Sequence, residues 1–396
     1  MNIVAEAPAA SNAVAALQAI EAELNATLIE RTEIVRLAIV AIVAREHMLI
    51  LGPPGTSKSH LINRLADHVA SPLGGGLSRF VYLMTKATTP SELFGPFSVK
   101  GMRDEDQFVR NTAGKLPEAA FAFLDEIFKS NSAILNALLT ITNERLFDNG
   151  PLRQEVPLIS LFGASNEMPQ GDDLGALWDR FMLRRVVSYV SDGGFAKLLR
   201  LARPGPPTAT IAAADLAAAQ DAALCVGVGD DTLGQIEQLR RDLASAGIAP
   251  SDRRWVKALD VMRANAFIDG RADVDEDDLA LLGDMLWQTP DQAAVIASTV
   301  GKIANPLKAK AIELGDQAHS VYESFQAVLK DSTVTDEQKA AKAIEAIGKF
   351  RKINAELAKI RPEADKAGGS VASKHGKVTA EIAKWNMELL QLATGA

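Results

Sequence analysis

Cysteine is nearly absent from this 396-residue sequence, in which Cys225 is the only one. A single cysteine excludes an intramolecular disulfide and a metal site built from thiolates. We interpret Cys225 as a small buried apolar residue. A reducing compartment fits this composition.

Long hydrophobic runs are missing as well. The most apolar segment, residues 34–44, contains Arg36 and is too short to cross a bilayer. The N-terminus carries Glu6, lacks a basic region and shows no signal-peptide pattern. We therefore expect a cytoplasmic protein without a transmembrane segment.

Basic residues are not in excess: 42 lysines and arginines stand against 50 acidic residues, a net charge of −8. This balance argues against a general polyanion binder, although it leaves room for a local basic pore. Hydrophobic residues make up 47% and charged residues 23% of the chain. Those proportions, with the length, are typical of a soluble globular protein of two or three domains.

What the sequence does contain is a glycine-rich loop, GPPGTSKS at 52–59. It differs from the phosphate-binding pattern G-x-x-x-x-G-K-[ST] only at Ser57, just before the lysine. An apolar run precedes the loop and a helical pattern follows it, which is the strand–loop–helix context that the pattern requires. Lys58 would pair with the β- and γ-phosphates, and the Ser59 hydroxyl would bind Mg²⁺. Ser57 is small, and we expect it to fit if its φ is negative.

Further strand-length apolar runs lie at 80–84, 120–124, 158–164 and 186–190. Helical patterns separate most of them, which predicts a largely parallel sheet with helices on both faces. Residues 94–116 are rich in glycine and charge, and we interpret them as an insertion, a hairpin carrying a mobile loop.

Polar side chains follow two of these runs. Asp125 and Glu126 come directly after four apolar residues, at the strand end where open α/β sheets bind ligands. Asp125 would hold the Mg²⁺ shell and Glu126 would polarise the attacking water. Asn166 ends another apolar run and could hold that water. Taken alone, these residues could equally belong to solvated turns.

Two arginines stand at positions of interest. Arg180 comes just before the last expected strand, and Arg253 opens a helix in the C-terminal half. Arginines are usually solvated or ion-paired, so neither is informative alone.

Residues 203–207, RPGPP, form the clearest linker, beyond which we expect no strands. From 290 onward the sequence is rich in Ala and Lys with heptad-like spacing, and it is punctuated by Pro306 and Pro362. This favours long packed helices.

With these features in order, the sequence resembles the MoxR family of AAA+ ATPases, in particular its RavA-like members. The shared segments are ERT at 30–32, the glycine loop, SELFGP at 91–96, the stretch 116–150, GASNEMP at 163–169 and SDRRWVKAL at 251–259. The similarity covers about residues 15–288. Such proteins also carry a small residue other than glycine before the lysine, so we interpret Ser57 as a trait of this branch.

The resemblance implies an α/β AAA+ domain at 1–203 with strand order 5-1-4-3-2 and the insert at 94–116. An all-helical lid would follow at 208–288, and a C-terminal helical bundle or stalk at 289–396. The phosphate loop, called Walker A, would bind ATP through Gly52, Pro53, Pro54, Gly55, Thr56, Ser57, Lys58 and Ser59.

The resemblance also assigns roles outside the loop. Asp125 and Glu126 would be Walker B, with Ser59 and Asp125 binding Mg²⁺, and Asn166 would be sensor 1. Arg253 would be sensor 2, reaching the γ-phosphate in its own subunit. Arg180 would be the arginine finger for the neighbouring subunit, with Arg184 as the alternative. A finger that acts on a neighbour requires a ring, expected to be a homo-hexamer with the insert facing its pore.

Three functions fit these residues. The first is an ATPase that remodels, matures or assembles a protein client, together with a von Willebrand A-domain partner. The second is a nucleic-acid motor, because related AAA+ clades carry the same insert; the acidic net charge argues against nucleic acid. The third is a slowly hydrolysing nucleotide-gated scaffold. Beyond residue 290 we find no β-rich pattern of the kind that RavA-like proteins insert there, so their partner recognition is not carried over.

Overall fold

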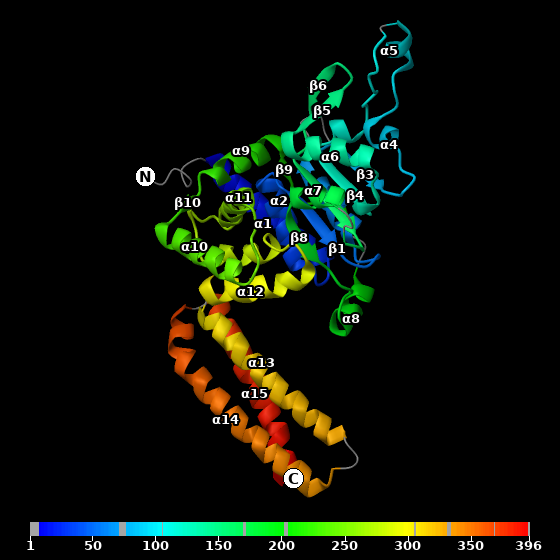
Figure 1. The fold of residues 1–396 in the computed structure, drawn as a ribbon. Coiled ribbons are helices and arrows are strands. Elements are labelled where there is room, and N and C mark those ends of the chain that lie inside the picture. The colour runs from blue at the N-terminus through cyan, green and yellow to red at the C-terminus, as the bar shows by residue number, and fades with distance from the viewer. Residues whose placement is uncertain are drawn as a thin grey trace. The chain divides into compact units, whose positions relative to one another are not determined.

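The computed structural model of the chain describes residues 8–70, 77–104, 106–168, 172–201, 205–304, 306–330, 334–367 and 369–394 (Figure 1). The chain divides into two compact units. The first comprises Met1–Leu233 and Pro250–Pro290, and the second comprises Gly234–Ala249 and Asp291–Ala396.

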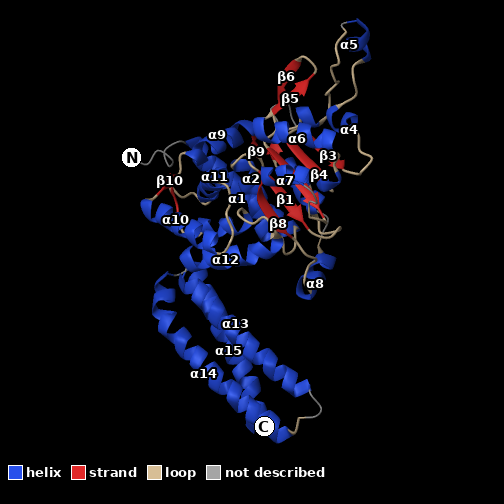
Figure 2. Cartoon of the chain, in the orientation of Figure 1, coloured by secondary structure: helices blue, strands red, loops and turns tan. Residues whose placement is uncertain are grey.

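A five-stranded parallel sheet forms the centre of the first unit (Figure 2). In chain order its strands are β1 (His47–Leu51), β3 (Arg79–Leu83), β4 (Phe121–Asp125), β7 (Ser160–Ser165) and β8 (Phe181–Val186). Their order across the sheet is β3-β4-β7-β1-β8, and each neighbouring pair is parallel. When the five strands are numbered along the chain, this is the predicted order 5-1-4-3-2, which is therefore confirmed.

The inner strands are mostly apolar because both of their faces are covered. Every residue of β1 is buried, and so is every residue of β7. The edge strand β3 differs, since Phe80 is buried while Val81 and Leu83 are 46% and 59% exposed. The alternation shows that one face of β3 is only partly covered.

Helices of the first unit surround this sheet. They are α1 (Pro8–Thr27), α2 (Thr32–Val43), α3 (Lys58–Asp67), α4 (Pro90–Phe94), α5 (Val99–Asp104), α6 (Ser132–Glu144), α7 (Asp172–Arg180), α8 (Asp192–Arg200), α9 (Ala213–Leu224) and α11 (Asp252–Ile268). Short 3₁₀ turns lie at η1 (Leu116–Glu118), η2 (Ile127–Lys129) and η3 (Asp278–Asp284).

Some elements differ from the sequence predictions. The last strand of the sheet was expected at 186–190 but is β8, five residues earlier. The expectation that strands end before residue 208 is also wrong. Beyond that point lie β9 (Ile211–Ala212), which pairs with β2 (Val69–Ala70), and the pair β10 (Gly227–Val228) and β11 (Asp273–Val274). The linker predicted at 203–207 lies partly outside the described residues.

The insert at 94–116 is a hairpin only at its base. Phe97 and Arg110 form an antiparallel bridge, and the chain between them contains α5. A second hairpin, β5 (Leu146–Asn149) and β6 (Leu152–Glu155), lies beside it (Figure 1). The Asn149 side chain accepts from Arg110 N at 2.6 Å and donates to Arg110 O at 3.1 Å. The two protrusions are therefore fixed to each other.

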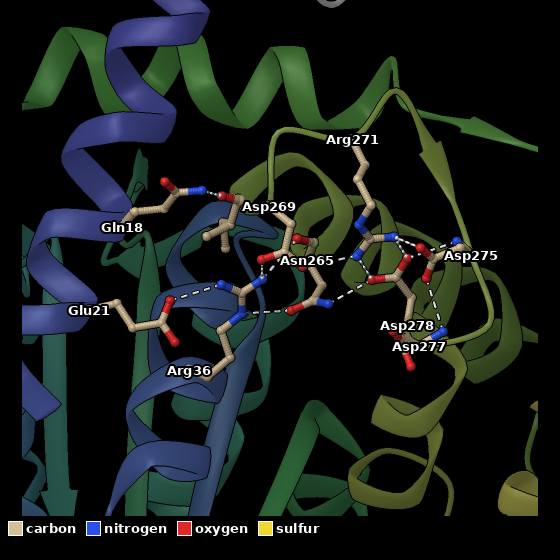
Figure 3. A network of polar contacts seen from close by, with 10 residues as sticks. Gln18, Glu21, Arg36, Asn265, Asp269, Arg271, Asp275, Asp277 and Asp278 are labelled. Atoms are coloured by element: carbon tan, nitrogen blue, oxygen red, sulfur yellow. Dashed lines mark hydrogen bonds and ion pairs between the residues drawn. The ribbon is translucent and has the colours of Figure 1, made fainter. Parts of the chain in front are cut away.

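A polar network joins α1 and α2 to the end of α11 (Figure 3). Arg36 on α2 donates to Glu21 at 2.8 Å, to Asn265 at 2.7 Å and to Asp269 at 2.6 Å. Asn265 in turn donates to Asp278 at 2.6 Å. Asp278 is fully buried and accepts from Arg271 as well. Asp275 N donates to Asp278 too, at 2.9 Å. A buried carboxylate with donors from three residues is well satisfied, so this network should hold the elements rigidly together.

The second unit is helical. Its elements are the C-terminal part of α10 (Asp230–Ser245), α12 (Pro290–Ala304), α13 (Pro306–Lys330), α14 (Asp336–Ala367) and α15 (Gly369–Thr394). The three long helices pack on a common apolar core that includes Leu314, Phe325, Phe350, Leu357 and Ile382. The predicted helical C-terminal region is confirmed, although α14 continues through Pro362 instead of breaking there.

Cys225 ends α9 and is exposed, so the interpretation of a buried cysteine is wrong. Its position just after the last turn of α9 places it outside the core. Among the described residues, no helix has the length and hydropathy of a membrane span.

Candidate active site

The glycine loop joins β1 to α3. Gly52 and Gly55 have φ of 152° and 80°, values that favour glycine. A side chain at Gly52 would also overlap the carbonyl oxygen of Val187. Gly52 N donates to Ser165 O at 3.0 Å, which ties the loop to the end of β7. The path of this loop therefore depends on both glycines.

Lys58, the first residue of α3, turns back over the loop. Its Nζ donates to Gly52 O and Pro53 O, both at 2.8 Å. Burial lowers the pKa of Lys58, while the negative charges of Asp125 and Glu126 oppose this. The ammonium thus lies inside the loop and close to both carboxylates, where it can meet phosphate oxygens.

Ser57 adopts φ of 66° and ψ of 20°, the left-handed conformation. The expectation of a negative φ at this position is therefore wrong. The reason is that the residue before the lysine keeps the backbone turn that glycine makes in the usual pattern, although its side chain is a serine. Its exposed hydroxymethyl group points away from the core and needs little room.

The two carboxylates lie at the carboxyl end of β4. Asp125 is its last residue, and Asp125 Oδ1 accepts from Glu126 N at 3.0 Å. Glu126 has a left-handed backbone, φ 53°, and its Oε2 lies 3.5 Å from Lys129 Nζ. That oxygen is buried and accepts no hydrogen bond. A buried carboxylate oxygen with an open acceptor position suits a residue that takes a proton from water.

Asn166 follows the last residue of β7 and is exposed. Since β7 lies between β4 and β1, the carboxyl ends of the three strands stand side by side. The structure therefore brings Asn166, the glycine loop and the two carboxylates to one edge of the sheet. Ser59 and Asp125 supply the kind of oxygen ligands that Mg²⁺ prefers. In the described part of the chain, no group of three or more His, Cys, Asp or Glu residues is arranged to hold a metal ion.

A cavity of about 380 Å³ opens beside the loop. Its walls come from Gly55, Ser57 and His60, from the turn after α1, and from Phe195 and Leu198 on α8. Apolar walls next to a phosphate loop fit the base and sugar of a nucleotide.

Arg180 and Arg253 lie at the opposite edge of the sheet, where the parallel strands begin. Arg180 precedes Phe181, which pairs with His47 at the start of β1, whereas the glycine loop follows the end of β1. Arg253 donates to the side chain of Asn143, near the end of α6. Both arginines line one small cavity together with Lys257. The expectation that Arg253 reaches the phosphate loop of its own chain is therefore not met.

The guanidinium of Arg180 is half-buried, and its Nε has no hydrogen-bond partner. Burial lowers the pKa of Arg180, and the nearby positive charge of Arg253 adds to this effect. The Asp179 carboxylate lines the same small cavity and partly offsets the two positive charges.

Arg184, the alternative to Arg180, is fully buried. It donates to the carbonyl oxygens of Phe181 at 3.1 Å, Trp178 at 3.0 Å and Trp287, and its guanidinium lies 4.5 Å from the centre of the Trp178 ring. A guanidinium enclosed and bonded in this way cannot reach another subunit. Arg184 is thus a structural residue.

Sequence reasoning missed a residue beside the loop. Arg31, in the turn between α1 and α2, donates from Nε to Thr56 O at 3.3 Å and from Nη2 to Ser188 O at 2.7 Å. The segment ERT at 30–32 is among the shared segments, but nothing in its composition indicates a contact with a loop 25 residues later.

Comparisons with known proteins agree with this geometry. The family described as "MoxR domain in the MoxR-vWA-beta-propeller ternary systems" matches residues 15–220, and an AAA lid domain family matches residues 231–300. The uncharacterized protein MJ0812 of Methanocaldococcus jannaschii is 38% identical over 355 residues, 89% of this chain and 92% of that protein. A second protein of that organism, MJ0079, is 37% identical over 88% of this chain and 90% of its own length.

Among solved structures, the crystal structure of a presumed ATPase from Cytophaga hutchinsonii is similar, with a TM-score of 0.61 and 17% sequence identity. The similarity covers 75% of this chain and 96% of that protein. At this level of identity it supports the fold alone.

Proposed function

Because the chain belongs to the MoxR family of AAA+ ATPases, we propose that it couples hydrolysis of ATP to the remodelling, maturation or assembly of a protein client. One observation carries the proposal. The glycine loop with Lys58, the carboxylates Asp125 and Glu126, and Asn166 all meet at the carboxyl edge of one parallel sheet.

Each residue has a chemical task in this proposal. Residues 52–59, Lys58 among them, would hold the phosphates of ATP, and Ser59 and Asp125 would hold a Mg²⁺ ion that neutralises the phosphate charge. Glu126 accepts a proton from the attacking water, for which its open, buried Oε2 is suited. Asn166 orients that water. The cavity beside the loop receives the nucleoside.

Two arginines of the small cavity, Arg180 and Arg253, act on the nucleotide of a neighbouring subunit in this proposal. Arg180 and Arg253 lie at the edge of the sheet opposite to their own phosphate loop. We assign Arg180 as the arginine finger and propose that Arg253 acts beside it, on the same neighbouring nucleotide. Sites shared between subunits require assembly, and the family suggests a closed homo-hexameric ring.

The partner and the client are proposed from two further observations. The description of the matching family names a von Willebrand A domain, so we propose a protein with that domain as partner. The insert exposes apolar side chains, with Val99 73% and Phe108 64% accessible, at its hairpin. Exposed apolar groups suit a polypeptide client better than a nucleic acid, as does the net charge of −8.

The test is the rate of ATP hydrolysis by the purified chain as its concentration is raised, with Mg²⁺ present. We expect the rate per subunit to increase with concentration, because assembly completes each site. Addition of a von Willebrand A-domain protein and its client should change the rate, and single-stranded DNA should not. No hydrolysis at any concentration would refute the proposal, and stimulation by DNA alone would favour a nucleic-acid motor.

A further inference from the structure

Arg31 contacts the glycine loop at Thr56 and lines the cavity beside it. It lies next to the phosphate-binding residues in space, but it belongs to the turn between α1 and α2. Its Nε donates to Thr56 O at 3.3 Å, and its Nη2 donates to Ser188 O at 2.7 Å. One guanidinium thus joins the loop to the segment that follows β8.

The contact with Thr56 bears on the direction of the next N–H group. The carbonyl of Thr56 and the N–H of Ser57 belong to one planar peptide unit and point in opposite directions. When Arg31 holds the Thr56 carbonyl, the Ser57 N–H points in the opposite direction, away from Arg31. Inward-pointing N–H groups are what such loops offer to phosphate oxygens.

This peptide is also the place where the backbone needs support. Ser57 has φ of 66°, which glycine adopts freely and serine does not. A residue in such a conformation persists when its surroundings fix it. Arg31 is the side chain that binds the peptide immediately before Ser57.

The turn that carries Arg31 is itself held in place. The Glu30 carboxylate accepts from Ser191 N at 2.7 Å and from Ser191 Oγ, at the start of α8. Farther along, Val187 N donates to Leu51 O at 2.7 Å. The turn that carries Arg31 is therefore bonded to the start of α8, and Arg31 itself bonds to Ser188 in the segment that follows β8.

We propose that Arg31 is a positioning residue for phosphate binding: it holds the Thr56–Ser57 peptide so that the loop can bind phosphates with serine in the place of glycine. This inference rests on the proposed function. Arg31 also lines the cavity assigned to the nucleoside, and the proposal assigns its effect on phosphate affinity to the loop.

The experiment measures the affinity of the full chain for a fluorescent ADP analogue, with the variants Arg31→Ala, Arg31→Lys and Ser57→Gly and the double variant Arg31→Ala/Ser57→Gly. We expect Arg31→Ala to weaken binding about tenfold, since one hydrogen bond from a charged donor is lost at a strained peptide. Arg31→Lys should fall between Arg31→Ala and the wild type. In the Ser57→Gly background, Arg31→Ala should weaken binding of the analogue about threefold or less, because glycine keeps the backbone conformation without support.

Arg241→Ala is the matched control, because Arg241 is an exposed arginine on α10 that pairs with Glu237. It should bind like the wild type. For Arg31→Ala, steady-state hydrolysis should show a raised KM for ATP, with kcat largely kept. Equal losses from Arg31→Ala in both backgrounds would overturn the inference, as would unchanged binding. If Arg31→Ala does not fold, the comparison uses Arg31→Lys in the two backgrounds. A wild type that binds no nucleotide would instead refute the proposed function.

Discussion

Replacement of Arg180 tests whether each active site is shared between two subunits. Within one chain, the start of β1 and its end are four residues apart, or about 13 Å at 3.3 Å per residue. Arg180 lies beyond the start of β1, and the glycine loop lies beyond its end. The guanidinium of Arg180 therefore cannot reach the phosphates bound by its own chain.

We expect Arg180→Ala to lower kcat by about 10³-fold, the scale of an arginine finger, while nucleotide binding is largely kept. Lys58→Ala should also be inactive, because its loop has lost the lysine. The two inactive proteins should restore activity when mixed. In a random 1:1 ring, about a quarter of the sites pair an intact loop with an intact Arg180, so the mixture should reach about a quarter of the wild-type rate per subunit.

The assay is steady-state ATP hydrolysis at several total concentrations, with co-assembly of the two variants checked by mass measurement. Recovery should rise with concentration. Wild-type protein mixed with Lys58→Ala serves to calibrate exchange between rings. If the two variants co-assemble and the mixture stays inactive, Arg180 is not a shared catalytic residue, and the argument from the sheet edges is wrong.

Three further outcomes follow from the site and the fold. Glu126→Gln should bind ATP but hydrolyse it at least ~100-fold more slowly in a single-turnover assay, since only the proton acceptor is lost; near-normal turnover would contradict this assignment. Lys58→Ala should weaken nucleotide binding itself, measured by calorimetry, and an unchanged affinity would show that Lys58 does not meet the phosphates. Hydrogen bonds, above all from the Thr208 hydroxyl, lower the pKa of Glu23 from 4.5 to about 2. The carboxylate therefore stabilises the fold above about pH 4.5, and this contribution is lost as the pH falls toward 2. Glu23→Gln should lower Tm at pH 7 and have little effect near pH 2, and an equal loss at both values would contradict this reasoning.

The sheet could be predicted from the sequence because its inner strands are continuous apolar runs. The strand β8 was placed five residues too late since Arg184 and Arg185 interrupt its apolar character. Arg184 is nevertheless fully buried, with its guanidinium satisfied by three carbonyl groups and an aromatic ring. A buried arginine of this kind depends on the tertiary structure, and no local pattern reveals it.

The same distinction applies to the candidate site. Local patterns are enough to predict the loop, the carboxylates and Asn166, because each stands at the end of a recognisable strand. The backbone of Ser57 and the location of Arg253 could not be predicted. The first depends on the path that the whole loop takes, and the second depends on how α11 packs against α6. The hairpin β5–β6 was missed although its turn residues, Gly150 and Pro151, form a known turn signal.

Helix α11 is fastened along its whole length. At its start Arg254 donates to Phe181 O at 2.8 Å, and one turn later Lys257 binds Glu46 at 2.6 Å. Near its end Asn265 accepts from Arg36 at 2.7 Å. A helix held in this way belongs to the rigid part of the subunit and is a poor candidate for an element that moves by itself. We therefore expect the conformational change that accompanies each round of hydrolysis to be a rigid-body rotation of whole subunits. The hinges would then lie at the interfaces between chains.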